Sequence, residues 1–154
     1  MKNAESLLTA FSAFFKEKMP VFIITVNDEN SDGLELDDFY DAVIFGEHCR
    51  TLPFVAVRLE QAELTEKDRI IENEVYTLEL ELNFQETSAK SERKKLRYIR
   101  AVCLFFEEYE FCDLWQRAKI TEFKKNSVFV GGGDVGDFLS VQIPFKCINA
   151  SDKR

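Results

Sequence analysis

VYTLELELNF, residues 75–84, alternates between apolar and polar side chains along its whole length. Mostly large apolar side chains lie on one side of this stretch when it is extended (Tyr76, Leu78, Leu80, Leu82 and Phe84). Mostly polar ones lie on the other side (Val75, Thr77, Glu79, Glu81 and Asn83). A period of two predicts a strand with one buried and one solvated face, which is typical of an antiparallel sheet.

Two segments have helical periodicity instead. The second, from Ser91 to about Glu110, follows the strand closely, and its apolar positions form one broad face: Leu96, Ile99, Val102, Cys103, Leu104, Phe105, Phe106 and Tyr109. The first runs from about Asn3 to Lys18 and carries the stripe Ala4, Leu7, Leu8, Phe11, Phe14 and Phe15. Because proline lacks an amide hydrogen, Pro20 is expected to end this helix, and Phe22–Val26 is predicted to be a short strand or an extended segment that leads into the sheet.

Three further strands are predicted. Phe54–Leu64 should pair with the 75–84 strand as a hairpin through the polar link LTEKDRI. Ile120–Lys125 is the next strand, with a possible extension to Val130, and Phe138–Ile148 is the last. The sequence therefore predicts an α+β fold, a mainly antiparallel sheet of about four strands with two main helices on one face. We expect a single domain over 1–154, with a flexible tail at 149–154.

Composition excludes several classes of protein. A 17.9 kDa chain with 45% hydrophobic residues can build a real core. Its net charge of −8 argues against general nucleic-acid binding, which needs basic surface. The N-terminus lacks a signal-peptide pattern, and the apolar run Val21–Val26 is too short to span a bilayer. We therefore expect a cytoplasmic protein without a membrane partner.

Residues 27–47 form an acidic segment that has no basic residue. Its first half has turn chemistry, and Leu36, Phe39, Tyr40 and Val43 in its second half have helical spacing, which predicts a short helix or turn there. The opening Asp28, Asn30, Asp32 and Gly33 matches an EF-hand loop, but position twelve is Phe39 where calcium binding requires a carboxylate. No metal site is predicted.

The motifs of enzymes and cofactor sites are also incomplete. Gly131, Gly133 and Gly136 fit GxGxxG, but a strand pattern follows them where a dinucleotide site needs a helix, so a hairpin loop is predicted. His48 and Cys49 are adjacent, which aims their side chains apart, and no orienting third group is evident. The cysteines have no CxxC spacing, and Cys103 and Cys147, which lie in apolar patterns, are predicted to be buried, reduced thiols. We expect no cofactor and no catalytic residues.

The second helix has an unusual distribution of charge. Basic residues crowd its beginning and acidic ones its end, the reverse of what the helix dipole prefers. These charges are either a solvated face or the interface of an oligomer in which a basic end meets an acidic surface of the next subunit. The candidate interface residues, which include two acidic residues of the 75–84 strand, are Lys90, Arg93, Lys94, Lys95, Arg97, Glu79, Glu81, Glu107 and Glu108.

In the order of its elements the chain resembles the tail-terminator, or tail-completion, proteins of long-tailed phages and prophages. The resemblance covers about Leu52 to Ile148, and its carriers are Pro53, Phe54, Val57, Arg58, the 75–84 strand, the helix to Tyr109, Trp115 and the strand Leu139–Phe145. It implies an α+β domain that assembles as a ring, commonly a hexamer, which caps the tail tube and joins it to the head connector. DNA would pass through without being bound. The acidic segment 27–47 departs from the family pattern and leaves the partner surface of the ring open.

The first hypothesis is thus a non-enzymatic structural assembly protein, cytoplasmic in the host and then part of the virion tail. Its partners would be other copies of itself and tail-tube or head-connector proteins. A second hypothesis is a small acidic regulatory or immunity-type module that binds a basic partner. A third is an enzyme that uses carboxylates in a cleft, although no spacing singles out a pair.

Overall fold

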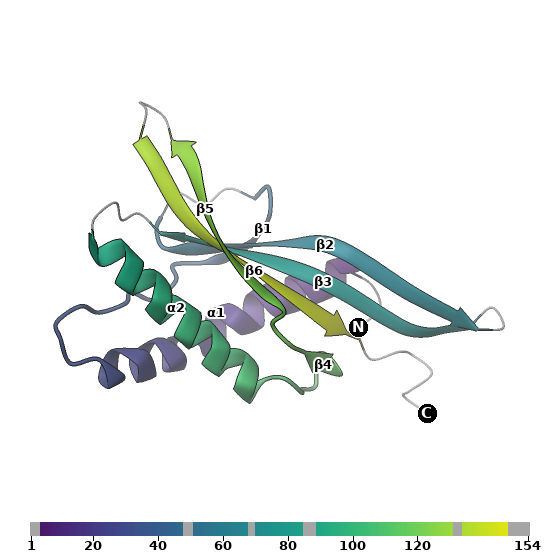
Figure 1. Ribbon diagram of the computed structural model, residues 1–154. Coiled ribbons are helices and arrows are strands. Elements are labelled where there is room, and N and C mark those ends of the chain that lie inside the picture. Colours follow the sequence, from purple (N-terminus) through teal and green to yellow (C-terminus); the bar gives the residue numbers. More distant parts are fainter. Residues whose placement is uncertain (1–3, 48–50, 68–69, 85–88, 131–133, 148–154) are drawn as a thin grey trace.

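The computed structural model describes residues 4–47, 51–67, 70–84, 89–130 and 134–147 (Figure 1). Its elements are the helices α1 (Ala4–Glu29) and α2 (Ala89–Glu108) and the strands β1 (Ala42–Ile44), β2 (Phe54–Lys67), β3 (Ile70–Phe84), β4 (Arg117–Ala118), β5 (Glu122–Val130) and β6 (Asp134–Lys146). The predicted α+β class is confirmed. The sheet differs from the predicted four antiparallel strands, because the described residues form six strands and β1 runs parallel to β2.

β3, which contains the alternating residues 75–84, lies in the middle of the sheet, between β2 and β6. β1, β2, β3 and β6 are neighbours in that order, and β4 and β5 pair one after the other with the far edge of β6. β2 and β3 form the predicted hairpin, which pairs antiparallel from Phe54–Asn83 to Lys67–Ile70. The alternation in residues 75–84 is confirmed on its apolar side, because Tyr76, Leu78, Leu80, Leu82 and Phe84 are all buried.

Both helices pack on the same face of the sheet (Figure 1). The core between these layers is rich in aromatic rings, and Trp115 is completely buried in it. Its ring lies edge-on to Phe145 with centroids 5.0 Å apart, and its Nε1 donates a 2.9 Å hydrogen bond to the carbonyl of Tyr109. The indole is therefore both packed and satisfied, as a buried tryptophan requires.

The prediction that Pro20 ends the first helix is wrong. α1 continues to Glu29, and the segment 22–26 that was predicted to be a strand or an extended segment is helical. Met19, Ile23 and Val26 prolong the buried stripe of Phe11 and Phe15 at helical spacing. Burying each such side chain contributes about 1.5–3 kcal/mol, which together outweighs a cost of about 3 kcal/mol for proline inside a helix.

The short helix predicted in the acidic segment is also wrong. Residues 42–44 form β1, which pairs with Val55–Val57, while Leu36 is buried without belonging to a helix or strand. The apolar residues of this segment therefore have helical spacing without forming a helix, because Leu36 packs in the core while Val43 lies in a strand of the sheet.

In α2 the buried face centres on Tyr98, Ala101, Val102 and Phe105, so that the side chain of Leu96 is 57% exposed.

The last strand starts earlier than predicted. β5 extends to Val130, and β6 begins at Asp134, where a loop was predicted. Gly136 pairs with Val128 inside this antiparallel hairpin, so the residues after the glycine motif form a strand, as predicted. Gly131, Gly133, His48, Cys49 and the predicted tail 149–154 lie outside the described residues.

Candidate functional site

The face of the sheet that the helices leave uncovered carries a polar network on neighbouring strands. The register aligns Arg58 of β2 with Glu79 of β3, and Glu79 with Gln142 of β6. The next row aligns Glu81 with Ser140. We call these five residues the sheet-face network. It exists because side chains alternate between faces, which puts the polar half of each strand on the same side.

Glu79 is the centre of the sheet-face network and is only 6% exposed. Its carboxylate accepts hydrogen bonds from Arg58 Nη2 at 2.7 Å, from the Ser140 hydroxyl at 2.7 Å and from Gln142 Nε2 at 3.1 Å. Burial alone would raise the pKa of Glu79, but the hydrogen bonds from Arg58 and Ser140, with the charge of Arg58, outweigh it and leave the pKa below its ordinary value. Glu79 is therefore a buried, satisfied carboxylate, which corrects its predicted place on a solvated face.

Glu81 behaves in the opposite way. Burial raises its pKa, and the nearby charge of Glu79 adds to that effect, although Arg58 Nη2 lies 3.9 Å from its Oε1 and lowers it. The guanidinium of Arg58 also lies 4.9 Å from the ring centroid of Phe45, a cation–π distance. The Glu79 carboxylate already accepts hydrogen bonds from three side chains of the same protein. The two glutamates are therefore not arranged as a general acid and base that are free to act on a substrate.

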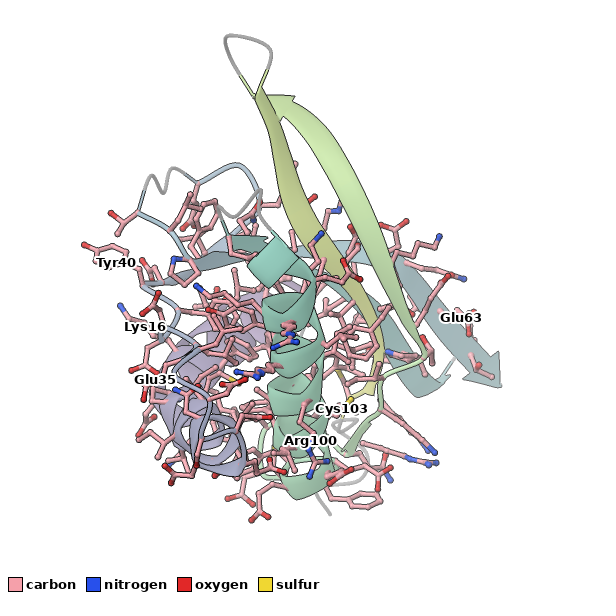
Figure 2. The ribbon with its side chains drawn as sticks, turned by 60° about the vertical axis from the view of Figure 1, so that its left-hand side comes forward. Lys16, Glu35, Tyr40, Glu63, Arg100 and Cys103 are labelled. Carbon is pink, nitrogen blue, oxygen red and sulfur yellow. The ribbon has the colours of Figure 1, made fainter. Side chains whose placement is uncertain are left out.

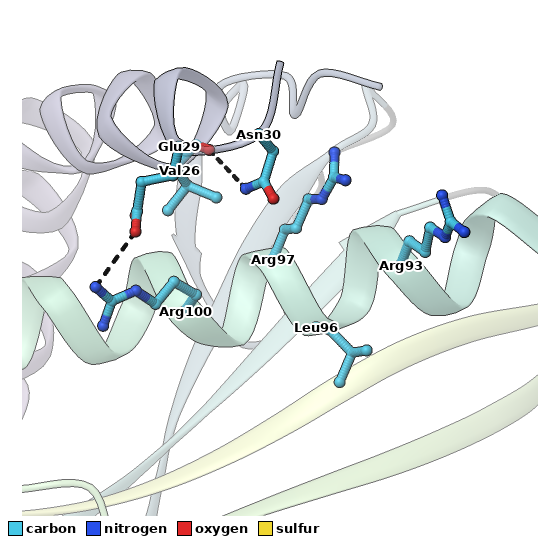
Figure 3. A pocket seen from close by; sticks show the side chains of 7 residues that line it. All are labelled: Val26, Glu29, Asn30, Arg93, Leu96, Arg97 and Arg100. Carbon is cyan, nitrogen blue, oxygen red and sulfur yellow. Dashed lines mark hydrogen bonds and ion pairs between the residues drawn. The ribbon is translucent and has the colours of Figure 1, made fainter. Parts of the chain in front are cut away.

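A second feature is a pocket of about 410 Å³ between the end of α1 and the beginning of α2 (Figure 3). The residues that line it, among them three arginines, are Val26, Glu29, Asn30, Arg93, Leu96, Arg97 and Arg100. Arg100 lies 3.5 Å from the carboxylate of Glu29, and Arg97 pairs with Asp32. Arg93 is exposed and has no ion pair with any described side chain. We call this the arginine pocket.

The acidic segment is tied to both helices by two sets of hydrogen bonds, one from Arg97 of α2 and one with Asn27 of α1. Arg97 donates to both carboxylate oxygens of Asp32 and to the carbonyl of Leu34. The side chain of Asn27, near the end of α1, donates to the carbonyl of Leu36 and accepts from its amide. These contacts hold the segment against α2 and bury Leu36, which explains why an acidic stretch stays close to the helices.

The third feature is the far part of the β2–β3 hairpin, residues 60–67 and 70–74, which we call the ribbon. β6 pairs with β3 only from Val75 onward, and β1 pairs with β2 only at Val55–Val57. Among the described residues, therefore, the two strands of the ribbon pair with each other, apart from the carbonyl of Glu74, which accepts a 2.9 Å hydrogen bond from the amide of Cys147. Figure 1 shows the ribbon projecting beyond the body of the molecule. Its Leu64 is 56% exposed, and Glu63 lies well away from α2 in Figure 2.

The structure brings only some of the predicted interface residues together. Arg93 and Arg97 meet in the arginine pocket, while Glu107 and Glu108 are exposed at the other end of α2. Lys95 is buried and Lys94 is half-buried. Glu79 and Glu81 lie on the sheet face away from the helices, and the side chain of Lys90 lies outside the described residues.

Sequence reasoning missed Arg58, Ser140 and Gln142 as partners of Glu79. The signal was present, because each occupies a polar position in an alternating strand, but their alignment depends on the order of strands in the sheet. It also missed Glu29 and Asp32 as partners of the basic end of α2. No local pattern indicates these pairs, which join residues more than sixty positions apart.

The remaining chemistry is that of structural side chains. Burial raises the pKa of the Cys147 thiol to about 11 and also raises that of Cys103. Nowhere in the described part of the chain do three His, Cys, Asp or Glu side chains gather as metal ligands would. Within the same residues, no helix has the length and apolarity needed to cross a bilayer.

No protein-family model matches the chain, and a comparison with curated proteins finds no significant match.

Proposed function

We propose that this protein is a non-enzymatic assembly protein, similar in role to phage tail terminators, that forms a ring and joins the tail tube to the head. The observation that carries the proposal is the ribbon. A two-stranded ribbon that projects from a domain is marginally stable by itself. Its edges from residue 60 to 67 and from 70 to 73 pair with no other described strand, and with the exposed Leu64 they suit contact with another chain. Such an element is expected in a protein that works by contact with other subunits.

The sheet-face network supports the same proposal. It is a polar cluster on the uncovered face of the sheet, in which Glu79 and Ser140 are buried and Arg58 is fixed by its ion pair with Glu79. A preorganised surface loses little side-chain entropy on binding, which favours specific contacts between proteins. The excess of negative charge would also repel the phosphates of DNA passing through a ring.

The test is the state of assembly of the purified chain. Sedimentation velocity over a wide range of concentrations, with electron microscopy of the largest species, is expected to reveal closed rings. A chain that stays monomeric at every concentration and also fails to form rings when mixed with tail tubes would contradict the proposal. Genes for head, tail-tube and tape-measure proteins are expected beside the gene of this protein.

The acidic binding module remains the second candidate. Glu35, Asp37 and Asp38 are exposed and have no ion pair with any described residue, so they could meet a basic partner. A persistent monomer, together with a neighbouring toxin gene, would favour this function over the ring.

A further inference from the structure

The ribbon and the arginine pocket lie at opposite ends of the molecule. In Figure 1 the β2–β3 hairpin projects at the right, whereas α2 begins at the left end of the molecule. The pocket lies at that beginning, since it is lined by Arg93, Leu96 and Arg97. The two features therefore cannot meet within one chain, but they can meet between two copies.

The ribbon is acidic. Within residues 60–74 the acidic side chains of the sequence (Glu60, Glu63, Glu66, Asp68, Glu72 and Glu74) outnumber the basic ones (Lys67 and Arg69). Glu63 and Glu66 are exposed and have no ion pair with any described residue. Leu64 lies between them in sequence and exposes 56% of its surface, so the ribbon combines negative charge with an exposed large apolar side chain.

The arginine pocket combines positive charge with an exposed apolar side chain, which complements the acidic ribbon. Of its three guanidinium groups, those of Arg97 and Arg100 are engaged by Asp32 and Glu29, which leaves Arg93 as the cation without a partner among the described side chains. Leu96 beside it is 57% exposed. A protein with a net charge of −8 thus has, next to an exposed leucine that lines the same pocket, a cation that forms no ion pair within the described part of the chain.

We infer that the ribbon of one copy docks into the arginine pocket of the next, with Glu66 near Arg93 and Leu64 against Leu96, because Leu64 and Glu66 are two positions apart in β2 and so lie on the same face of the ribbon. This inference rests on the proposed function and specifies its subunit contact. Two different surfaces meet in such a contact, which makes it heterologous. Repeating it adds subunits in one direction and produces a closed ring when the rotation closes, or a filament when it does not.

The experiment is a charge exchange between two variants. E63K/E66K reverses the ribbon, and R93E reverses the pocket; none of these residues lies in the core or in the sheet-face network. Each variant by itself is expected to raise the dissociation constant of self-association at least about tenfold, because like charges then face each other. An equimolar mixture is expected to restore assembly, since each ribbon then finds a pocket of opposite charge.

Controls separate misfolding from a lost contact. D38K changes an exposed acidic residue away from both features and is expected to assemble like the wild type. Circular dichroism and the melting temperature are compared for all variants. Wild-type association is also expected to weaken as salt is raised, because exposed charges are screened, and this measurement needs no variant.

The outcomes are distinct. If both variants form rings like the wild type, or if the mixture does not recover, the inferred contact is wrong while the ring proposal stands. If the mixture recovers assembly but electron microscopy shows open filaments, the contact is correct and the ring is not. A wild type that never associates overturns both.

Discussion

Arg97 holds Asp32 with hydrogen bonds to both carboxylate oxygens, although sixty-five positions separate the two residues in sequence. The same guanidinium binds the carbonyl of Leu34, and Gly33 between them adopts a left-handed backbone with φ of +82°. One side chain of α2 thereby fixes the turn that follows α1.

The Asp32–Arg97 pair predicts a dependence of stability on pH. The hydrogen bond from Arg97, followed by that from the Leu34 amide, lowers the pKa of Asp32 from 3.8 to about 2. A carboxyl whose pKa is lower in the folded state stabilises the fold above its unfolded pKa, and this contribution is lost as the pH falls from 3.8 to about 2. D32N should therefore lose less stability than the wild type over this range.

Thermal unfolding at pH values between 2 and 6 measures this difference. D38N serves as the matched control, because Asp38 is exposed and has no ion pair with any described residue. Equal slopes for D32N and the wild type would mean that the pair does not lower the pKa of Asp32.

The sheet-face network predicts coupling between Arg58 and Glu79. E79A removes the acceptor of three hydrogen bonds and leaves the Arg58 guanidinium without its 2.7 Å partner. Because Arg58 remains 37% exposed, water compensates in part, and we expect a loss of about 1–3 kcal/mol in the free energy of unfolding. Urea unfolding of E79A, R58A and the double variant measures the coupling.

The control for that cycle is E81Q, which keeps the shape of a neighbouring side chain whose pKa is already raised. It is expected to change stability by less than E79Q does. Additive losses in the double variant would show that Arg58 and Glu79 act independently.

Pro20 predicts a stabilising substitution. It lies inside α1, where proline lacks the amide that would bond to the carbonyl of Lys16. P20A should restore that bond and raise the free energy of unfolding by about 1–3 kcal/mol, reduced by the greater freedom of the unfolded chain. V21A, next to it and 62% exposed, is the control with little expected effect. A lower melting temperature for P20A would show that the packing of the ring matters more than the missing bond.

Trp115 predicts a fluorescence signal for unfolding. It is the only tryptophan and is completely buried, so the native emission should be blue-shifted and poorly quenched by acrylamide. W115F loses the hydrogen bond to Tyr109 and part of the packing against Phe145, so the free energy of unfolding is expected to fall by about 1–3 kcal/mol. F111A, a change to an exposed ring, should cost no more than about 0.5 kcal/mol. Similar losses in both variants would contradict the central place of Trp115 in the core.

Burial was predicted correctly for strand residues that alternate strictly between apolar and polar side chains. The apolar side of residues 75–84 and the alternating residues Leu139 to Cys147 are buried as expected, because alternation depends only on the geometry of an extended chain. Pro20 was misread because a local rule was outweighed by the burial of Met19, Ile23 and Val26. The spacing of Leu36 to Val43 suggested a helix, but pairing with β2 determined the conformation of residues 42–44.

The candidate sites could be predicted only in part. The clustering of Arg93 and Arg97 follows from helical spacing, and the sequence indicates it. Their partners in the acidic segment, and the donors around Glu79, come from distant parts of the chain. Neither spacing nor composition encodes which distant segments become neighbours, so these contacts required the three-dimensional arrangement.

The position of β6 has a consequence for synthesis of the protein. β6 lies between β3 on one side and β4 and β5 on the other, and each of these partners precedes it in the chain. While the ribosome is still making residues 134–146, β3 has an unpaired edge and β5 has no neighbour. The two parts of the sheet can therefore be joined only after β6 has emerged from the exit tunnel. Because β6 then pairs with β3, about sixty residues earlier in the sequence, we expect folding of the sheet to be slow.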